Sequence, residues 1–433
     1  MNSLKKNILP FLFVFLTMTS ITQWSSFPIG NTFTDWTLFL TIMLTFLFQN
    51  KYWYDKSNKD NLWALKIYLF WVIICFIRGV FVAEFYWDFK NLINGGFALL
   101  MVYSVYTFTN PILVQLVFRK WLQIAFPLFI LFILVVDIDA YGFYLIPISF
   151  LALFLPIINS KWKLIIVSVS LFVIIASVEA RTNVIKFSVP ILFSFLFYFR
   201  KMLVPKLLAK IQLFVFILPF VLLFLAATGI FNIFKMDEYI STKSNTVRVN
   251  SQGMEEDLLG DSRTFLFQEV ILSAIKNDYV LFGRTLARGN DSASFGAGAA
   301  EELRTFRYER YDNEVGILNV FTWTGIVGVI LYFFIFFKAA RLAIVYSNSY
   351  FLKILGIYVS FRWLTSWIED FNRFDIMNLF IWIVVGICYS KQFRKMSDQD
   401  FKIWMNGIFK RNNKKHSFIS YKIPSNTTSL NGK

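Results

Sequence analysis

The chain has 433 residues, of which 57% are apolar and only 16% are charged. A water-soluble domain carries about 25% charged residues, so the charged side chains are too few to cover a water-facing surface. Apolar runs recur from one end of the chain to the other, as in a polytopic membrane protein. Composition therefore excludes soluble enzymes, secreted disulfide scaffolds and disordered chains.

The apolar runs predict an all-α polytopic membrane protein with twelve transmembrane helices, at about 20 residues for each helix. The predicted spans are 7–24, 33–49, 62–82, 92–109, 121–136, 142–158, 164–179, 184–199, 211–232, 316–337, 351–367 and 376–390. The predicted domains are 1–232 with helices 1 to 9, 233–315 as one large outer loop, 316–390 with helices 10 to 12, and 391–433 as a basic tail.

Lysine and arginine set the predicted orientation. With the N-terminus in the cytoplasm, most of the 43 Lys and Arg residues fall on the cytoplasmic side, and the even span count returns the C-terminus there. The net charge of +16 then reflects topology, and no nucleic-acid partner is expected. The tail is either solvated or lies on the anionic inner leaflet through Phe401, Trp404, Met405 and Ile408, which have helical spacing.

The large loop contains signals of order. Asp261 or Ser262 can cap a helix, whose predicted apolar face consists of Leu266, Val270, Ile271, Ala274 and Ile275. Further along, Gly289–Gly298 predicts a mobile flap, and the three-residue spacing of Arg304, Arg307 and Arg310 predicts one helical face. Long loops on compact folds commonly carry function, so the loop and the helix ends beside it are where chemistry is expected.

Cysteine and histidine limit that chemistry. Cys75 and Cys388 both lie inside apolar runs, so neither a disulfide nor a thiolate metal site is expected. The single histidine, His416, lies in the tail, which excludes a Ser-His-Asp triad and a multi-histidine zinc site. The prediction is that the protein uses neither a metal nor a cofactor.

Charged residues at the outer ends of the spans are candidates, because charge in a bilayer is costly without a reason. Glu179 and Arg181 stand between spans 7 and 8, where they can pair with each other. Alternatively, the planar fork of Arg181 suits a phosphate. Arg263 stands at the start of the loop helix and is either an ordinary surface residue or part of an anion site with the helix N-terminus.

Four further charged residues lie later in the loop. Arg284 and Arg288 flank a short turn, and Asp312 and Glu314 precede span 10. A carboxylate at that rim can act as general base toward a sugar hydroxyl, or it can simply cap the helix.

Arg362 lies inside span 11 and is a functional candidate because it is charged within the membrane. The alternative is a structural ion pair with Glu369 or Asp370, which follow it.

Three segments carry a family resemblance through their order along the chain. They are Glu179–Thr182, then Asp261–Arg263 with the helix and the Leu281–Gly283 turn after it, then Asp312–Glu314 with Gly325-Ile326-Val327-Gly328. In this order they resemble the O-antigen polymerase and O-antigen ligase superfamily of bacterial membrane glycosyltransferases, over roughly residues 164–345. Ligases of that family carry a histidine ahead of the Gly-x-x-Gly, and its absence here favours a polymerase.

The resemblance implies a polymerase of lipid-linked oligosaccharide repeat units in the bacterial inner (cytoplasmic) membrane, with the large loop in the periplasm. The donor would be an oligosaccharide on undecaprenyl pyrophosphate, and an acceptor sugar hydroxyl would displace it in one inverting, metal-independent step. Membrane lipids and a chain-length regulator protein are the other implied partners. The implied catalytic residues are Arg181, Arg263, Glu314 and Asp312, and the implied substrate-binding residues are Arg284, Arg288, Arg362 and Glu179.

Two other functions remain open from the sequence. A ligase would transfer the glycan to a lipid A core. A transporter or flippase for lipid-linked sugars would also need many spans and buried arginines, but the long loop and the arginines at its rim favour transfer over transport.

Overall fold

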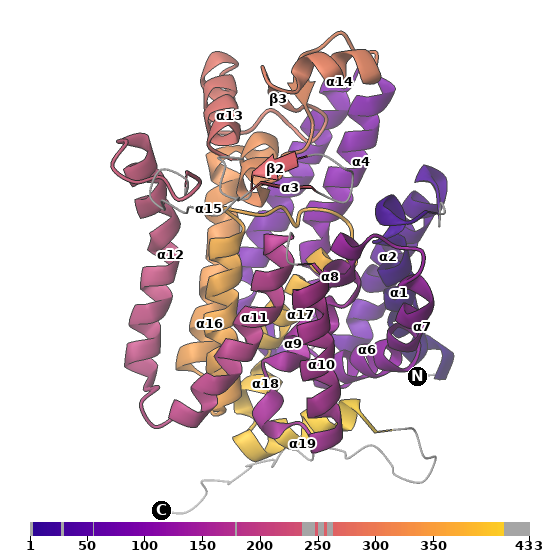
Figure 1. Cartoon of the computed structure of the whole chain (residues 1–433), viewed down its shortest axis with the longest axis vertical. Helices are drawn as coiled ribbons and strands as arrows, with labels where there is room; N and C mark the ends of the chain where they lie inside the picture. Colours follow the sequence, from indigo (N-terminus) through magenta and orange to yellow (C-terminus); the bar gives the residue numbers. More distant parts are fainter. Residues whose placement is uncertain are drawn as a thin grey trace, which may run out of the picture.

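The computed structural model describes residues 3–26, 30–54, 56–177, 180–235, 247–249, 255–257 and 263–410. This part of the chain is almost wholly helical (Figure 1). Seven of its helical segments are long and apolar enough to cross a membrane: Asn7–Trp24, Trp63–Val82, Tyr86–Phe108, Pro111–Phe132, Thr182–Phe199, Pro205–Ala227 and Gly316–Val345. The predicted fold class, an all-α membrane protein, agrees with these segments.

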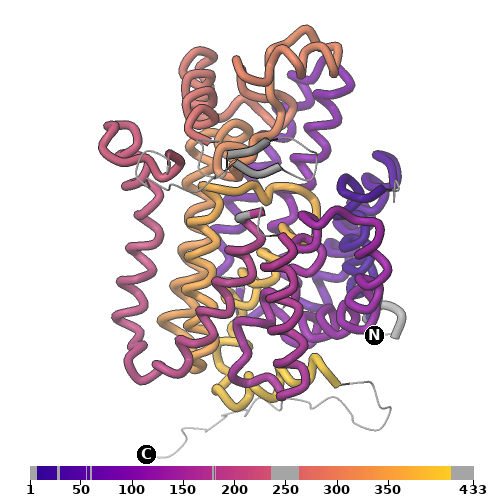
Figure 2. Tube along the Cα trace, in the orientation of Figure 1, coloured from indigo at the N-terminus to yellow at the C-terminus, as the bar shows by residue number. Residues whose placement is uncertain are grey.

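The N-terminal half consists of helices that run back and forth along the long axis of the molecule (Figure 2). Three of them begin at an asparagine, because the side chains of Asn31, Asn110 and Asn159 accept backbone N–H groups of the first helical turn. The elements are α1 (Ser3–Thr19), η1 (Thr22–Trp24), α2 (Thr32–Trp53), η2 (Lys56–Asn61), α3 (Trp63–Val82), α4 (Tyr86–Leu100), η3 (Met101–Tyr103), α5 (Ser104–Phe108), α6 (Pro111–Gln123), α7 (Ala125–Phe132), η4 (Ile138–Ala140), α8 (Tyr141–Tyr144), α9 (Ile146–Ala152), η5 (Leu155–Ile157), α10 (Ser160–Ala176), α11 (Arg181–Phe195), η6 (Leu196–Phe199) and α12 (Pro205–Ala227).

The C-terminal half begins with the loop and returns to the bundle. Its elements are β1 (Val247–Val249), β2 (Glu255–Asp257), α13 (Thr264–Lys276), β3 (Asn290–Asp291), α14 (Gly296–Glu302), β4 (Glu309–Arg310), α15 (Gly316–Val345), α16 (Tyr350–Thr365), α17 (Ile376–Tyr389), α18 (Lys391–Lys395) and α19 (Asp398–Ile408). The two short sheets pair β1 with β2 and β3 with β4, both antiparallel.

Several helix boundaries differ from the sequence-based prediction. The predicted span 121–136 crosses a break at Ile124, where α6 ends and α7 begins. The predicted span 142–158 is divided into short helices, since η4, α8, α9 and η5 follow one another there. In α15 the backbone leaves the helical region at Gly325, so a short first segment precedes the longer second one.

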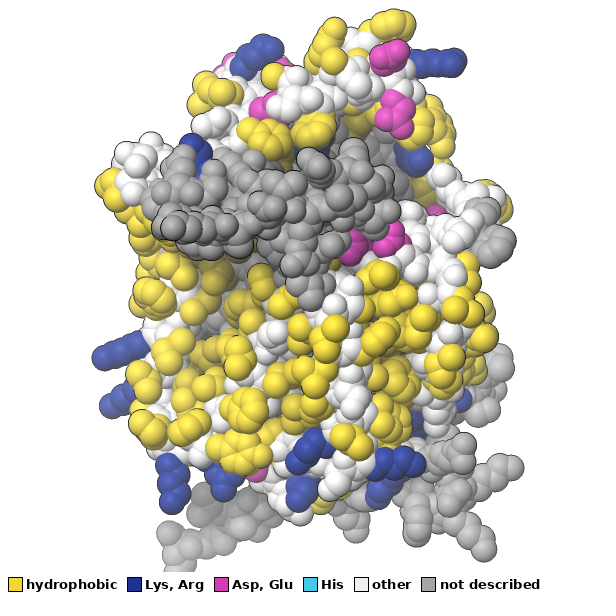
Figure 3. All heavy atoms as spheres, in the orientation of Figure 1, with side chains coloured by type: hydrophobic (Ala, Val, Ile, Leu, Met, Phe, Trp, Pro, Cys, Tyr) yellow, Lys and Arg dark blue, Asp and Glu magenta, His cyan; other side chains and the backbone are white. Residues whose placement is uncertain are grey.

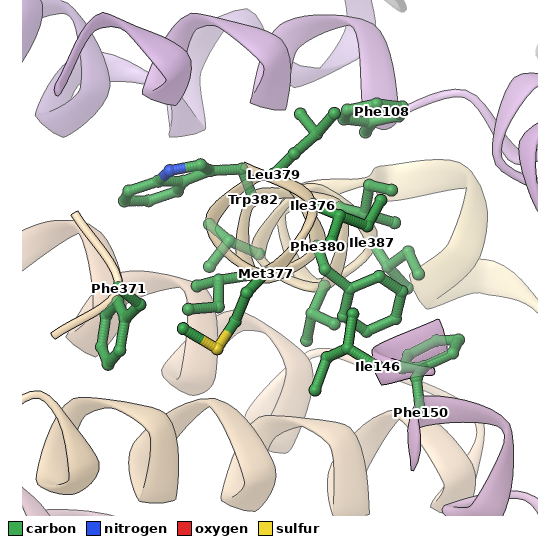
Figure 4. Packing of buried hydrophobic residues seen from close by; sticks show 14 of the residues in the cluster. Phe108, Ile146, Phe150, Phe371, Ile376, Met377, Leu379, Phe380, Trp382 and Ile387 are labelled. Carbon is green, nitrogen blue, oxygen red and sulfur yellow. The ribbon is translucent and has the colours of Figure 1, made fainter. Parts of the chain in front are cut away.

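The core is centred on α17, which is apolar on every side because it is surrounded by other helices. Each of its residues from Ile376 to Tyr389 is buried. Aromatic rings from distant segments pack against it (Figure 4): Phe380 lies 5.3 Å from Phe150 and 5.7 Å from Phe118 between ring centroids. Helices α5, α9, α15 and α16 are among the elements that pack against α17.

Helices α18 and α19 close one end of the bundle, which we call the latch end. The apolar face predicted for α19 exists, but Phe401, Trp404, Met405 and Ile408 are buried against the protein. The alternative in which this face lies on a lipid leaflet is therefore wrong. Lys and Arg side chains gather at the latch end of the visible face (Figure 3), whereas residues 411–433 lie outside the described part.

The opposite end carries the loop subdomain, residues 263–315, with α13, α14 and the β3–β4 pair (Figure 1). The glycine-rich stretch contains β3 and the start of α14, and the predicted mobility of this flap stays a prediction. Residues 303–308 are not helical, and Arg304 has a φ of 52°, so the predicted helical face of arginines is wrong. In α13 the predicted Leu266, Val270 and Ala274 are buried, but Ile271 and Ile275 are exposed.

Candidate functional site

The Leu281–Gly283 turn inserts into the break of α15, which brings together two of the segments that carry the family resemblance. Gly283 and Gly325 have φ values of 72° and 69°, a region that favours glycine. A Cβ on Gly283 would come within 2.5 Å of the Gly325 nitrogen, and a Cβ on Gly325 within 2.3 Å of the Leu281 oxygen. Both positions therefore require glycine.

Hydrogen bonds satisfy the backbone groups that this break exposes. The Ile326 N–H donates to the Val280 oxygen (2.9 Å), and the Arg284 N–H donates to the Thr322 oxygen (2.7 Å). Arg78 on α3 donates to the oxygens of Phe282 (2.7 Å) and Gly283 (3.1 Å). Sequence reasoning missed Arg78, although a lone arginine inside the predicted span 62–82 is a recognisable signal.

A first group of arginines, which we call the paired cluster, lies inside the loop subdomain. Arg284 donates to Asp291 (2.7 Å) and to Glu309 (3.0 Å), and Arg288 donates to both oxygens of Glu309. Burial alone would raise the pKa of Asp291, but hydrogen bonds from Lys276 and Arg284 lower it to about 2. Carboxylates of the same chain occupy both guanidinium groups, so we reassign Arg284 and Arg288 from substrate binding to holding the loop.

Arg307 belongs to the same paired cluster and ties the loop to the α3–α4 connection. It donates to Asp88 (2.9 Å) and pairs with Glu84. Asp88 is fully buried and accepts three further bonds, from the Tyr311 hydroxyl (2.6 Å) and from the N–H groups of Glu84 (2.9 Å) and Phe85 (3.2 Å). Ion pairs between Arg307 of the loop subdomain and carboxylates of the α3–α4 connection therefore hold the loop subdomain against the bundle.

A second meeting point is the connection between α16 and α17, residues 366–375, which we call the hub. The Arg263 Nε donates to the Ile368 oxygen (2.8 Å), which joins the start of α13 to the hub. The N–H of Gly316 donates to the Glu369 oxygen (3.1 Å), which joins the start of α15. Segments that are far apart in the sequence therefore converge on these ten residues.

Lys186 on α11 points to the hub from the other side. Its side chain is 1% exposed, pairs with Glu369, and has its Nζ 4.4 Å from the centre of the Phe143 ring. Sequence reasoning missed this lysine, although it is the only charged residue of the predicted span 184–199. Burying a lysine costs free energy of folding, so its presence here indicates a role for the side chain.

Arg362 on α16 lies beneath the hub and is 3% exposed. Its Nε and Nη2 have no hydrogen-bond partner in the described part of the chain, and its guanidinium carbon lies 5.0 Å from the centre of the Phe371 ring. The ion pair with Glu369 or Asp370 is absent among the described residues, since Glu369 pairs with Lys186 and Asp370 lies 3.6 Å from Arg373. A cation buried without a counter-charge is destabilising.

Carboxyl groups lie around Arg373 in the hub. Burial raises the pKa of Asp370 to about 6, with Arg373 opposing the shift. Burial raises the pKa of Asp375 to about 7, opposed by its bond from the Asn378 N–H and by Arg373. Asp312 is exposed and lies close enough to Arg373 to interact with it electrostatically. Asp370 and Asp375 therefore exchange protons near neutral pH.

The remaining predicted residues divide into two sets. Arg263, Asp312 and Arg362 lie at or beside the hub. Glu314 is exposed, accepts a bond from Arg310 (3.2 Å) and interacts electrostatically with Arg373 of the hub. Arg181 is the first residue of α11, while Glu179, Asp261 and Ser262 lie outside the described residues.

The hub combines two chemical capabilities. Lys186 and Arg362 can bind an anion, and a carboxyl that titrates near neutral pH can accept a proton. Among the described residues, no group of three His, Cys, Asp or Glu side chains is arranged to hold a metal ion. Comparison with family models, curated proteins and solved structures finds no match for this chain.

Proposed function

We propose that the chain is a membrane glycosyltransferase that polymerises lipid-linked oligosaccharide repeat units. The proposal rests on the resemblance of three segments to O-antigen polymerases and ligases and on the charges around the hub. The reaction would transfer the growing glycan from undecaprenyl pyrophosphate to a sugar hydroxyl of another lipid-linked repeat.

The proposed arrangement in the membrane has twelve crossings, both termini in the cytoplasm and the loop subdomain in the periplasm. The gathering of Lys and Arg at the latch end supports this orientation, because positive charge is retained on the cytoplasmic side (Figure 3). The hub would then lie at the periplasmic end of the bundle, in the inner membrane of a bacterium. Donor and acceptor would both meet the protein from that side.

The observation that carries the proposal is the buried, unpaired guanidinium of Arg362 beside the Lys186–Glu369 pair. Such a group lacks the counter-charge that would stabilise it within the described chain, and a pyrophosphate supplies one. The guanidinium and the ammonium would stabilise the negative charge that develops on the leaving pyrophosphate. Arg263, which lies at the edge of the hub, would contact the same group.

The bond changes of the proposed step are simple. The acceptor oxygen attacks the anomeric carbon, the bond from that carbon to the pyrophosphate oxygen breaks, and the electron pair leaves with undecaprenyl pyrophosphate. The proton of the acceptor hydroxyl passes to a carboxylate, for which Asp370 and Asp312 are the candidates at the hub. Positioning of the two glycans supplies much of the acceleration.

The latch end disfavours the transporter alternative. The carbonyl oxygens of Trp404 and Gly407 in α19 accept bonds from Gln115 and Arg119 of α6 (both 2.6 Å). Asp398 also accepts the Ser349 hydroxyl (2.7 Å) in the connection between α15 and α16. An alternating-access carrier has to open at this end, and these bonds hold α19 against α6 and against the connection between α15 and α16.

The test is a gel of surface glycan from cells that lack the gene. Lipid A carrying a single repeat, with the longer ladder lost, supports the polymerase. Loss of all glycan from lipid A, with long polymer still on the carrier, supports the ligase alternative instead. Single repeats accumulating on the cytoplasmic side of the membrane would show a transporter and overturn the proposal.

A further inference from the structure

Part of the loop subdomain lies beside α3 rather than beyond its end. Trp71 in α3 donates through Nε1 to the Thr324 oxygen (2.9 Å), and its ring lies 5.9 Å from that of Phe282. One turn before the end of α3, a Cβ added to Gly79 would meet Ala287 at 3.6 Å. Residues 281–287 therefore run along the second half of α3.

Helix α3 has the features of a membrane crossing over its whole length. Its 20 residues are apolar enough to cross a membrane, and their length matches the thickness of a bilayer. Exposed apolar side chains follow one side of the helix from its second turn to its last turn: Ile67, Phe70, Ile73, Ile77, Val80 and Phe81. This stripe has the spacing of a single helical face that contacts lipid.

Aromatic residues mark the outer end of that stripe. Tyr86 is exposed beside Phe85 at the α3–α4 connection, and Lys90 lies over the Trp87 ring at 4.5 Å. Tyrosine and tryptophan gather at the level of lipid headgroups, so this connection lies at the interface. The segment beside Trp71 and Gly79 is consequently deeper than the headgroups.

Protein groups satisfy the backbone hydrogen bonds of this segment, as a position within the bilayer requires. Non-helical backbone is tolerated there only where protein groups satisfy it. The Leu286 oxygen accepts a hydrogen bond from Asn91 (2.7 Å), and Arg78 donates hydrogen bonds to the oxygens of Phe282 and Gly283. Leu286 and Ala287 are fully buried, whereas Leu281 and Phe282 are more than half exposed.

We propose that residues 280–288 are a re-entrant segment, with Leu281 and Phe282 inserted among the lipid chains of the outer leaflet. The exposed apolar surface continues from these two residues onto Ile326 and Ile330 of α15, and it is continuous with the lipid-facing stripe of α3 through Trp71. The partner of this surface is therefore the bilayer. The inference does not depend on the proposed transferase activity.

Site-directed spin labelling in liposomes of the full chain tests the proposal. A nitroxide is placed at Leu281→Cys in a background with Cys75→Ala and Cys388→Ala, which removes the two buried thiols. Phe70→Cys, on the lipid-facing stripe, and Glu301→Cys, exposed on α14, are the matched controls. Collisions with oxygen report lipid, and collisions with a water-soluble nickel complex report water.

The label at Leu281 is expected to behave as that at Phe70, with high oxygen and low nickel accessibility. Nickel accessibility equal to that at Glu301 would place the turn in water and overturn the proposal. Protection from both reagents would show a protein contact and overturn it equally. Adding Arg78→Met should release the turn and raise nickel accessibility, and an unchanged value would overturn the anchoring by Arg78.

Discussion

The paired cluster and the hub both contain arginines near the loop end, but their charges are balanced in different ways. In the paired cluster, Arg284 and Arg288 each contact carboxylates of the same subdomain. At the hub, Lys186 has one carboxylate and the buried Arg362 has none among the described residues. An arginine in a motif therefore indicates a function only once its partners are known. The paired cluster stabilises the loop, and we propose that the buried cations at the hub bind an anion.

Arg362→Met should have the largest effect. Loss of a group that stabilises the leaving pyrophosphate is expected to reduce polymer by about 100-fold or more. Stability should stay equal or rise, because a buried unpaired charge is replaced by an apolar side chain of similar length. Glycan gels and thermal unfolding of the purified protein measure the two effects. Arg341→Met, at an exposed arginine of α15, is the control and should change neither.

Glu309→Gln should show the opposite pattern. It leaves Arg284 and Arg288 facing each other without their shared carboxylate, which is expected to lower stability by about 3 kcal/mol. Any loss of polymer should then follow the loss of folded protein. Glu302→Gln, on the exposed side of α14, is the control. A stable but inactive Glu309→Gln protein would move the candidate site from the hub to the paired cluster.

Gly283→Ala and Gly325→Ala test the joint between the loop subdomain and the bundle. Each would place a methyl group against backbone atoms at a positive φ, which is expected to cost roughly 1–3 kcal/mol or more. Gly298→Ala has open space around it and a helical backbone, so its stability should change little. Unfolding midpoints of the three variants would rank them, and equal midpoints would contradict the described packing of the turn.

The smallest expected effect is on the pH dependence of stability, which should differ between the hub and the paired cluster. Asp370 and Asp375 have pKa values raised to about 6 and about 7, so their folded forms hold protons that the unfolded chain releases near pH 4. Their contribution is complete below pH 4 and declines as pH rises to about 7. Asp291, with a pKa of about 2, contributes above pH 4 and loses that contribution on acidification.

The unfolding temperature should therefore fall by a few degrees between pH 5 and pH 8. Asp375→Asn should flatten this neutral range, and Asp291→Asn should flatten only the acid range below pH 4. A neutral range that is unaffected by Asp375→Asn would mean that the hub carboxyl is not protonated in the folded protein.

The sequence predicts the helical class and several helix positions well, because apolar length is a local property. It also predicts the turn at Gly283 and the Gly325-x-x-Gly328 run as separate motifs, although nothing local shows that they contact each other. The break of α15 at Gly325 and the divided helices after Ile124 depend on packing with distant segments. Those features are therefore invisible to hydropathy.

The candidate site was predicted less well for a related reason. Arg284 and Arg288 resemble anion-binding residues in the sequence, but Glu309, which neutralises both, lies more than twenty residues away. Lys186 was overlooked within an apolar run, and Arg78 likewise. Arg362 was identified because charge inside a membrane helix is a strong local signal.

The most direct test of the central claim is complementation of a gene-deleted strain with wild-type protein and with Arg362→Met at equal membrane levels. We expect a full glycan ladder from the wild type and single-repeat glycan from the variant, with the variant as stable as the wild type. A full ladder from Arg362→Met would contradict the central claim, because the hub would then not be the site of glycan transfer.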